Sequence, residues 1–282
     1  MARTAVTAPA TTISARRGPR ALATAAAVAV ALLLAGCGDR AQPTAAGAGD
    51  PPVGAPPAAQ VTVSPSAATT ATADAGTQAA TPAPALVARA TGDLPVFDAP
   101  EGAPVKTLPG TTGFGSRTVA LVIEDGDAAA DGWLEVLLPG RPNGATGWVS
   151  ADDVELREVA LEVRVDLDAR TVAVLDGGER LLTAAAAIGD ADHPTPTGRF
   201  YVVDKLETPD PGGAYGPFAI GLSARSEVLT EFGGGDGQIG IHGTNVPDSI
   251  GRAVSHGCLR VDNGVIAQLA DLLPLGTPVT IV

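Results

Sequence analysis

Short apolar runs at strand spacing begin near residue 86 and continue to the C-terminus. In residues 161–167 apolar and charged side chains alternate at every position, which is typical of a half-buried strand. Turn-forming residues separate this run from others that are rich in aliphatic and β-branched side chains. The further runs predicted as strands in this part of the chain are 171–175, 181–188, 199–203 and 279–282. The pattern therefore predicts a mainly β protein.

Residues 86–156 show the same pattern on a smaller scale. Their short β-rich runs lie at 86–88, 94–97, 118–123, 133–138 and 147–150. The stretch Arg141-Pro-Asn-Gly144 predicts a tight turn, because proline presets φ and Asn-Gly tolerates positive φ. This region is predicted to form a small β-barrel. We expect Trp133 and Trp148 in its core rather than on its surface as stacking residues.

Residues 262–273 have the period of a helix instead. Asp262 or Asn263 is suited to cap the N-terminus of this helix, and Gly276 follows its end. Its buried face is predicted to consist of Val265, Ile266, Leu269, Leu272 and Leu273. Ahead of the helix, residues 207–236 are rich in Gly and Pro, and we expect an irregular lid or binding loop there.

The N-terminus has the pattern of an export signal. Three arginines between residues 16 and 20 precede the apolar run Ala21–Leu34, whose 14 residues are fewer than the ~20 that span a bilayer. The run ends in Leu34-Ala-Gly-Cys37, which resembles a bacterial lipobox. We therefore expect a lipoprotein signal peptide over residues 1–37, with Cys37 lipidated. The alternative is an ordinary cysteine inside a signal or anchor.

The composition of the chain predicts a linker and argues against partners that bind through a basic patch. Gly, Ala, Pro and Thr dominate residues 38–85, which predicts a disordered linker. The chain is 45 % hydrophobic but only 3 % aromatic, and much of the apolar count is alanine, so the first third adds little to a core. The formal net charge of −13 argues against binding nucleic acid or anionic lipid through a basic patch.

The candidate chemistry is concentrated in residues 239–261. His242 ends an apolar run, a Gly/Pro/Asp/Asn-rich loop follows, and Ser255-His-Gly-Cys258 closes the stretch. An imidazole within hydrogen-bond reach of a cysteine can take its proton and hold the resulting ion pair. Gly257 leaves the backbone beside the sulfur bare, so a substrate carbonyl could point its oxygen at main-chain N–H groups. With Cys37 lipidated, Cys258 would have no disulfide partner.

Two other interpretations of these residues stay open at this point. A lone cysteine is often a small buried hydrophobe, and a lone histidine is often satisfied by hydrogen bonds alone. His242, His256 and Cys258 could instead ligate zinc. The polar residues on both sides of Cys258 favour a catalytic site over these two. The third histidine, His193, is expected to be a surface loop residue.

The motif His242-Gly-Thr244, followed by Ser255-His-Gly-Cys-Leu-Arg260, resembles the signature of the L,D-transpeptidase (YkuD-type) catalytic domain. The similarity extends from about Val159 to Val282 and includes the Thr-Pro-Thr-Gly element that ends at Gly198. The resemblance implies a YkuD-type β-sandwich with one or two short helices over residues 157–282.

The two tryptophan-containing runs resemble a bacterial SH3-like domain. They are Trp133-Leu-Glu-Val and Gly147-Trp-Val. This second resemblance implies a small SH3-like β-barrel over residues 86–156, ahead of the catalytic domain.

The YkuD resemblance also implies roles for individual residues. The cysteine of that family is the nucleophile and the upstream histidine is the general base and acid, so Cys258 and His242 inherit these roles. Gly243 would orient the imidazole through its backbone carbonyl. The residues implied to complete the site are Thr244, Ser255, His256, Gly257 and Arg260. Some members of the family carry Ser or Asn where Gly243 and Arg260 stand.

The implied function is peptidoglycan cross-linking without a metal or an organic cofactor. A donor stem tetrapeptide would form a thioester with Cys258, and an acceptor amine would then take the acyl group. Acylation by carbapenem-type β-lactams follows from the same resemblance. With the lipid anchor at Cys37, the expected location is the outer face of the cytoplasmic membrane.

Two alternatives to this function are a cell-wall cysteine peptidase or carboxypeptidase with the same site, and a non-catalytic wall-binding lipoprotein. A papain-like enzyme is disfavoured, because no histidine follows Cys258 in the chain.

Overall fold

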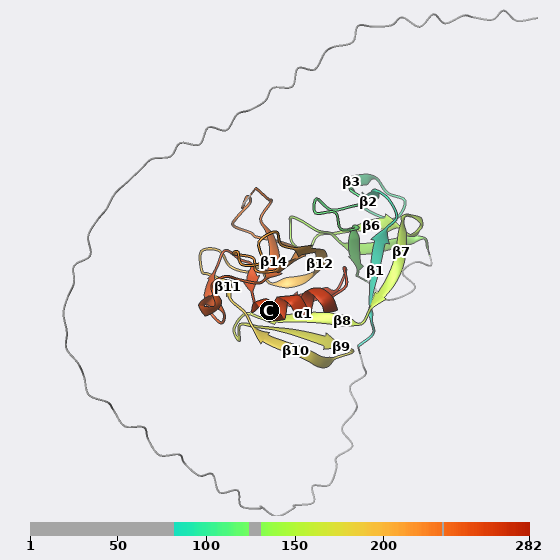
Figure 1. Cartoon of the computed structure of the whole chain (residues 1–282). Coiled ribbons are helices and arrows are strands. Elements are labelled where there is room, and N and C mark those ends of the chain that lie inside the picture. Colours follow the sequence, from blue (N-terminus) through green and yellow to red (C-terminus); the bar gives the residue numbers. More distant parts are fainter. Residues whose placement is uncertain (1–81, 124–130, 233) are drawn as a thin grey trace, which may run out of the picture. The chain divides into compact units, whose positions relative to one another are not determined.

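The computed structural model describes residues 82–123, 131–232 and 234–282 (Figure 1). The predicted signal peptide, Cys37 and nearly all of the predicted linker lie outside the described residues. Within the described part of the chain, no helix is both long and apolar enough to cross a membrane.

The first half of the described chain forms a seven-stranded sheet. Its strands, in spatial order, are β3 (Pro104–Leu108), β2 (Leu94–Phe97), β6 (Thr146–Ser150), β5 (Trp133–Leu137), β4 (Val119–Val122), β1 (Ala85–Ala90) and β7 (Val154–Val159). The predicted turn at residues 141–144 joins β5 to β6. Two strands were not predicted: β3 begins with proline and is mostly exposed, and β7 is charged at most of its inner positions.

The prediction that both tryptophans belong to the core of this sheet is wrong. Leu134 and Val149 are fully buried in its main hydrophobic cluster. Because side chains alternate between the two faces of a strand, their neighbours Trp133 and Trp148 face the other way. Both tryptophans are half-buried, and the Trp133 ring meets the Phe97 ring edge-on at 5.0 Å between centroids.

The second half forms an eight-stranded sheet. Its strands, in spatial order, are β10 (Glu179–Ala185), β9 (Thr171–Asp176), β8 (Leu161–Asp166), β17 (Pro278–Ile281), β12 (Gly198–Glu207), β13 (Phe218–Arg225), β14 (Gln238–His242) and β16 (Leu259–Arg260). A separate parallel pair joins β11 (Ile188–Gly189) to β15 (Ala253–Ser255). The expectation of a mainly β protein is confirmed.

The helix α1 (Asn263–Leu272) packs against this sheet (Figure 1). The side chain of Asp262 caps it by accepting a hydrogen bond from the Gly264 N–H at 2.8 Å. Ile266 and Leu269 are fully buried with strand residues in one hydrophobic cluster, as predicted. Leu272 is 37 % exposed, so its predicted place on the buried face is wrong.

The prediction of one irregular segment over residues 207–236 is also wrong, because β13 lies inside it. Ile220 and Leu222 are buried in the sheet and alternate with Gly221 and Ser223. A Cβ at Gly221 would lie 2.7 Å from the side-chain nitrogen of Gln238 on β14, so that flexible side chain would have to move to admit a larger residue. A strand with small residues at alternate positions has little propensity signal in the sequence.

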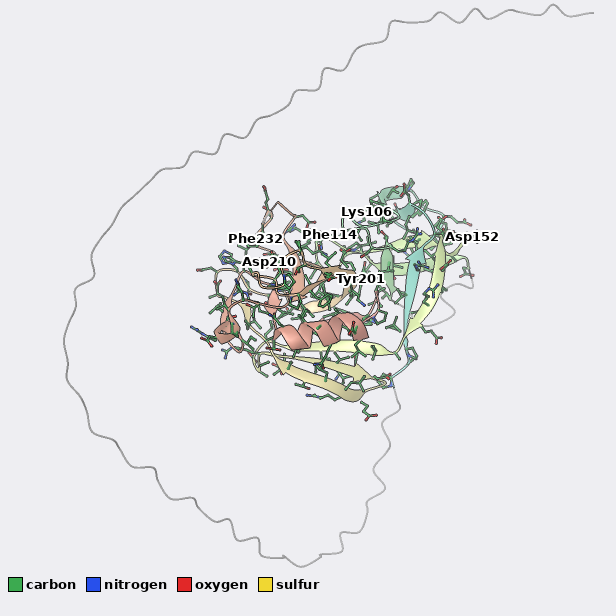
Figure 2. The ribbon with its side chains drawn as sticks, viewed as in Figure 1. Lys106, Phe114, Asp152, Tyr201, Asp210 and Phe232 are labelled. Atoms are coloured by element: carbon green, nitrogen blue, oxygen red, sulfur yellow. The ribbon has the colours of Figure 1, made fainter. Side chains whose placement is uncertain are left out.

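A third hydrophobic cluster contains side chains from both sheets. Tyr201 and Val203 of β12 pack there against residues of the seven-stranded sheet (Figure 2). The buried partners from that sheet are Val87, Val119, Leu121, Leu137 and Val159. All described residues fall within one compact unit of the chain.

Candidate active site

Strand pairing brings the two halves of the motif together. β14 and β16 are parallel, with Ile241 opposite Leu259 and His242 opposite Arg260. Side chains two residues apart share a face, so Cys258 projects from the same face as His242 and Arg260. From strand spacing and rise, the Cα atoms of Cys258 and His242 are about 8 Å apart. His242 is the last residue of β14, as the sequence predicted.

The Cys258 thiol lies over the start of β14. Its Sγ donates a weak hydrogen bond to the Gln238 carbonyl at 3.8 Å. Burial raises the pKa of the Cys258 thiol, while a hydrogen bond from the Gly240 backbone N–H and the charge of Arg260 act in the opposite direction. The Gly240 N–H of β14 thus acts to lower the pKa of the thiol, an effect that sequence reasoning missed.

The His242 imidazole is buried and held in one tautomer. Its Nδ1 lies 2.6 Å from the Gly243 carbonyl oxygen, which can only accept, so Nδ1 carries the hydrogen and Nε2 has a free lone pair. Burial lowers the pKa of His242 to about 4; the Gly243 carbonyl opposes this shift and the Arg260 charge adds to it. The ring is thus a neutral base at neutral pH.

The raised pKa of Cys258 and the lowered pKa of His242 favour an uncharged thiol and an uncharged imidazole in the free protein, rather than the thiolate–imidazolium pair that the motif suggests. Low polarity around both groups penalises both charged forms. Among the described residues, no hydrogen bond joins the His242 ring to the Cys258 sulfur. Catalytic hydrogen bonds are often long before substrate binds and shorten in the complex.

The peptide bond between Gly243 and Thr244 is held at both ends. Its carbonyl accepts from His242 Nδ1, and its N–H donates to the side-chain oxygen of Asn263 at 2.8 Å. Asn263 is the first residue of α1, so the helix fixes the group that orients the imidazole. Thr244 is buried, and its hydroxyl accepts a hydrogen bond from the Val246 N–H.

Thr195 and Ser255 fix the backbone that leads into Cys258. The Thr195 hydroxyl donates to the Gly257 carbonyl at 2.8 Å and accepts from the Gly189 N–H at 2.9 Å. Since a trans peptide places its N–H opposite its carbonyl, the Cys258 N–H points away from Thr195. The Ser255 hydroxyl donates to the Cys258 carbonyl at 2.6 Å and accepts from the Gly257 N–H at 3.2 Å.

These contacts reduce the number of main-chain N–H groups that are available to bind an oxyanion. The Gly257 N–H is engaged by Ser255, whereas the N–H groups of His256 and Cys258 donate to no other described residue. Gly257 has φ = +112°, and a Cβ there would lie 3.0 Å from the Ile239 side chain. Glycine is therefore required for the chain to present Cys258 in this way.

His256 belongs to a row of three rings close to Cys258 in the chain. Its ring is 4.9 Å from the His193 ring and 5.3 Å from the Phe232 ring, and it stacks on Phe232 at 30°. The Nδ1 of His193 lies 3.1 Å from a carboxylate oxygen of Asp190. His193 lies in a loop, as expected, but it is only partly exposed and its ring packs against that of His256.

Tyr215 covers the base from the segment between β12 and β13. Its ring lies 4.7 Å from that of His242. Burial raises the pKa of Tyr215, with a further contribution from the nearby Cys258 and an opposing one from Arg260.

The predicted site residues thus lie around one short strand pair, and five further residues join them: Thr195, Tyr215, Phe232, Gly240 and Asn263. Only Thr195 had a sequence signal, since it lies in the Thr-Pro-Thr-Gly element. Tyr215 and Phe232 lie within residues 207–236, where a lid or binding loop was expected, but the sequence did not single them out as site residues. The described residues hold no group of three or more His, Cys, Asp or Glu side chains suited to a metal ion.

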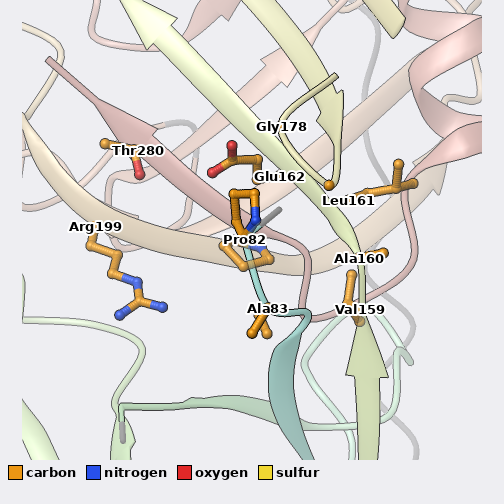
Figure 3. Close-up of a pocket in the computed structure, with 12 residues that line it drawn as sticks. Pro82, Ala83, Val159, Ala160, Leu161, Glu162, Gly178, Arg199 and Thr280 are labelled. Atoms are coloured by element: carbon orange, nitrogen blue, oxygen red, sulfur yellow. The ribbon is translucent and has the colours of Figure 1, made fainter. Parts of the chain in front are cut away.

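A separate hollow lies between the start of β1 and the outer surface of the eight-stranded sheet (Figure 3). Glu162, Arg199 and Thr280 line it together with Pro82, and none of the predicted site residues contributes to it. It is therefore distinct from the site around Cys258.

Comparison with known proteins agrees with the motif. Residues 161–281 match the family model YkuD, described as an L,D-transpeptidase catalytic domain. A Bacillus subtilis protein, L,D-transpeptidase YkuD by name, is 32 % identical over 146 residues, which are 52 % of this chain and 73 % of that protein. Its Bacillus licheniformis namesake is 35 % identical over 123 residues, 44 % of this chain and 66 % of that protein.

Solved structures also align with part of this chain. An L,D-transpeptidase from Mycobacterium smegmatis aligns with a TM-score of 0.36 at 20 % identity, over 59 % of this chain and 91 % of that one. Bd1075 from Bdellovibrio bacteriovorus aligns with a TM-score of 0.35 at 30 % identity, over 44 % of this chain and 48 % of that one.

Proposed function

The chain belongs to the YkuD-type L,D-transpeptidase family, and from that premise we propose how its residues carry out the reaction. It is an L,D-transpeptidase, an acyltransferase that cross-links peptidoglycan. The observation that carries the assignment of roles is the parallel pairing of β14 with β16. This pairing places a free thiol and a buried neutral imidazole on one face of the sheet.

In the first half-reaction the donor is a stem tetrapeptide whose carbonyl before the terminal D-residue lies at Cys258. As Sγ attacks that carbon, His242 Nε2 takes the thiol proton, and the Gly240 N–H stabilises the charge developing on sulfur. The free N–H groups of His256 and Cys258 hold the oxyanion. The C–N bond then breaks, the D-amino acid leaves with the proton from His242, and a thioester remains.

In the second half-reaction an acceptor amine attacks the thioester. His242, neutral again, takes a proton from the amine as the C–N bond forms, and returns one to the sulfur as the C–S bond breaks. Net transfer exchanges one amide bond for another, so the reaction needs no oxidant, nucleotide or metal. Arg260, whose charge reaches both Cys258 and His242, is positioned to attract an anionic group of the stem peptide.

The remaining proposals concern the rest of the chain. The strands of residues 85–159 and the tryptophan pattern support an SH3-like domain ahead of the catalytic one, with the boundary expected at residues 156/157 moved to the end of β7 at Val159. The lipobox-like end of the N-terminal run supports lipidation of Cys37. A lipid-anchored protein on the outer face of the cytoplasmic membrane, with residues 38–85 as a linker, would reach the peptidoglycan.

The decisive experiment incubates the purified chain with disaccharide-tetrapeptides and identifies the products by mass spectrometry. We expect cross-linked dimers and released D-amino acid from the wild type, and neither from Cys258→Ala. A carbapenem should leave a covalent adduct that peptide mapping locates on Cys258. Release of the D-amino acid without dimers would indicate a carboxypeptidase that uses water as acceptor. Absence of both the adduct and the products would indicate a non-catalytic protein.

A further inference from the structure

The segment that carries Phe232 is held at its base by a residue of the other sheet. Residues 226–232 and 234–237 connect β13 to β14, and the Ser226 N–H donates to the Gly237 carbonyl at 2.8 Å, which closes the base. The Ser226 hydroxyl accepts from the N–H groups of Val228 and Leu229. Farther along, Phe232 and Gly235 exchange two backbone hydrogen bonds.

The guanidinium of Arg141 fills this base. Arg141 lies in the turn between β5 and β6, and its three nitrogens donate to three main-chain carbonyls of the segment. Nε and Nη2 donate to Ser226 at 3.1 and 2.6 Å, Nη2 also donates to Leu229 at 2.8 Å, and Nη1 donates to Asp236 at 2.8 Å. A planar fork with five N–H donors can serve several carbonyls at once, which a lysine ammonium at one point cannot.

Neighbouring contacts set the register of this turn on β13. The Asn143 side chain donates to the Arg225 carbonyl at 2.8 Å and accepts from the Arg225 N–H at 2.9 Å. The Gly140 N–H donates to the Ser223 carbonyl at 3.1 Å. Arg225 also pairs with Asp236 at 2.7 Å, across the base of the segment. These contacts fix the turn at residues 141–144 on β13 independently of the hydrogen bonds that Arg141 makes with the segment.

At the other end of the segment, Phe232 stacks on His256, two residues before the nucleophile. Phe232 is 45 % exposed, so burial alone does not fix the position of its ring. The backbone of the segment must therefore fix it. We propose that Arg141 is a positioning residue for the active site: it fixes the segment so that Phe232 stays on His256 and forms a wall of the substrate cleft beside Cys258. This inference rests on the proposed function and adds to it a role for the first sheet.

The test measures two reactions of Cys258 in the full chain. Acylation by a carbapenem requires the substrate cleft, whereas alkylation by iodoacetamide requires only an accessible thiol. For Arg141→Ala we expect acylation to fall about tenfold, because displacing a binding wall by about 1 Å has effects of this order or larger. Alkylation should stay within about twofold of the wild type, since the groups that set thiol reactivity are untouched.

A double-mutant cycle then connects the two ends of the segment. If Arg141 acts through Phe232, the double variant Arg141→Ala/Phe232→Ala should be no slower in acylation than Phe232→Ala alone. Arg141→Lys should retain only part of the wild-type rate. Arg157→Ala, which removes an exposed arginine from β7 of the same sheet, is the matched control and should have no effect.

Each outcome decides something separately. A wild type that is never acylated overturns the proposed function itself. A wild type that is acylated normally, together with an unaffected Arg141→Ala, overturns only the positioning role. Equal loss of acylation and alkylation, or additive effects of the two substitutions, also overturns it, because these indicate a general disturbance. Should Arg141→Ala fail to fold, Arg141→Lys carries the same comparison.

Discussion

At the scale of single residues, the reactive pair is neutral before the substrate binds. Burial disfavours the Cys258 thiolate and the His242 imidazolium alike, so the proton has to move during attack rather than before it. At the location that we propose, outside the cytoplasm, this order would protect the thiol, because a neutral thiol reacts slowly with oxidants until a substrate aligns it with the base.

The neutral pair predicts that acylation and alkylation depend differently on pH. The pKa of His242 is lowered to about 4, so the base is already deprotonated from about pH 5 upward and is lost as the pH falls through 4. Acylation should therefore be nearly flat between pH 6 and 8. Free thiolate is scarce in that range because the pKa of Cys258 is raised, so iodoacetamide alkylation should rise about tenfold for each pH unit.

His242→Gln provides the comparison for this profile. Loss of the base should slow acylation at pH 7 by about 10²–10⁴-fold. The remaining acylation should then rise with pH in parallel with alkylation, because only preformed thiolate reacts. A wild-type acylation rate that itself tracks alkylation would contradict general-base transfer and support a preformed ion pair.

At the scale of elements, the first residue of α1 controls the orientation of the base. Asn263 accepts from the Thr244 N–H, and the carbonyl of the same peptide bond holds His242 Nδ1. For Asn263→Ala we expect kcat to fall about tenfold with little change in KM, since the peptide can rotate and the imidazole loses its fixed tautomer.

Asn263→Asp is the matched variant for this prediction, because a carboxylate oxygen at the same place still accepts from the Thr244 N–H and suits a helix N-terminus. It should recover most of the rate, measured as formation of cross-linked dimers. If Asn263→Ala lowered the melting temperature but left kcat unchanged, the contact would be structural only.

The same scale shows what the sequence could and could not predict. The proximity of His242 and Cys258 in the fold was predictable because both lie within one continuous stretch, and an apolar run before the histidine marks the strand. The helix was predictable from its period and its Asp262 cap. In contrast, β13 was hidden by Gly221 and Ser223, which interrupt its apolar pattern. Tyr215 and Phe232 reach the site only through tertiary packing, which no local pattern encodes.

At the scale of the whole molecule, the two sheets share one hydrophobic cluster. Tyr201 is fully buried in it, and its hydroxyl has no hydrogen-bond partner among the described residues. Residues of both sheets therefore lose buried contacts if either sheet unfolds, which predicts one cooperative transition rather than two. The hydrogen bonds of Arg141 and Asn143 to the second sheet also couple the unfolding of the two sheets.

The chain contains separate reporters for the two sheets. Both tryptophans, Trp133 and Trp148, lie in the seven-stranded sheet, and Cys258 lies at the edge of the other. On heating, tryptophan fluorescence and pulse alkylation of Cys258, quantified by peptide mapping, should give the same midpoint.

Tyr201→Ala should lower both midpoints together by ~10 °C, since truncating a buried aromatic costs about 3–5 kcal/mol. Tyr201→Phe keeps the ring and removes only the unpartnered hydroxyl, so it should leave both midpoints unchanged or slightly raised. If Tyr201→Ala separated the two midpoints, the sheets would fold independently, and Arg141 could not fix the Phe232 segment once the first sheet had melted.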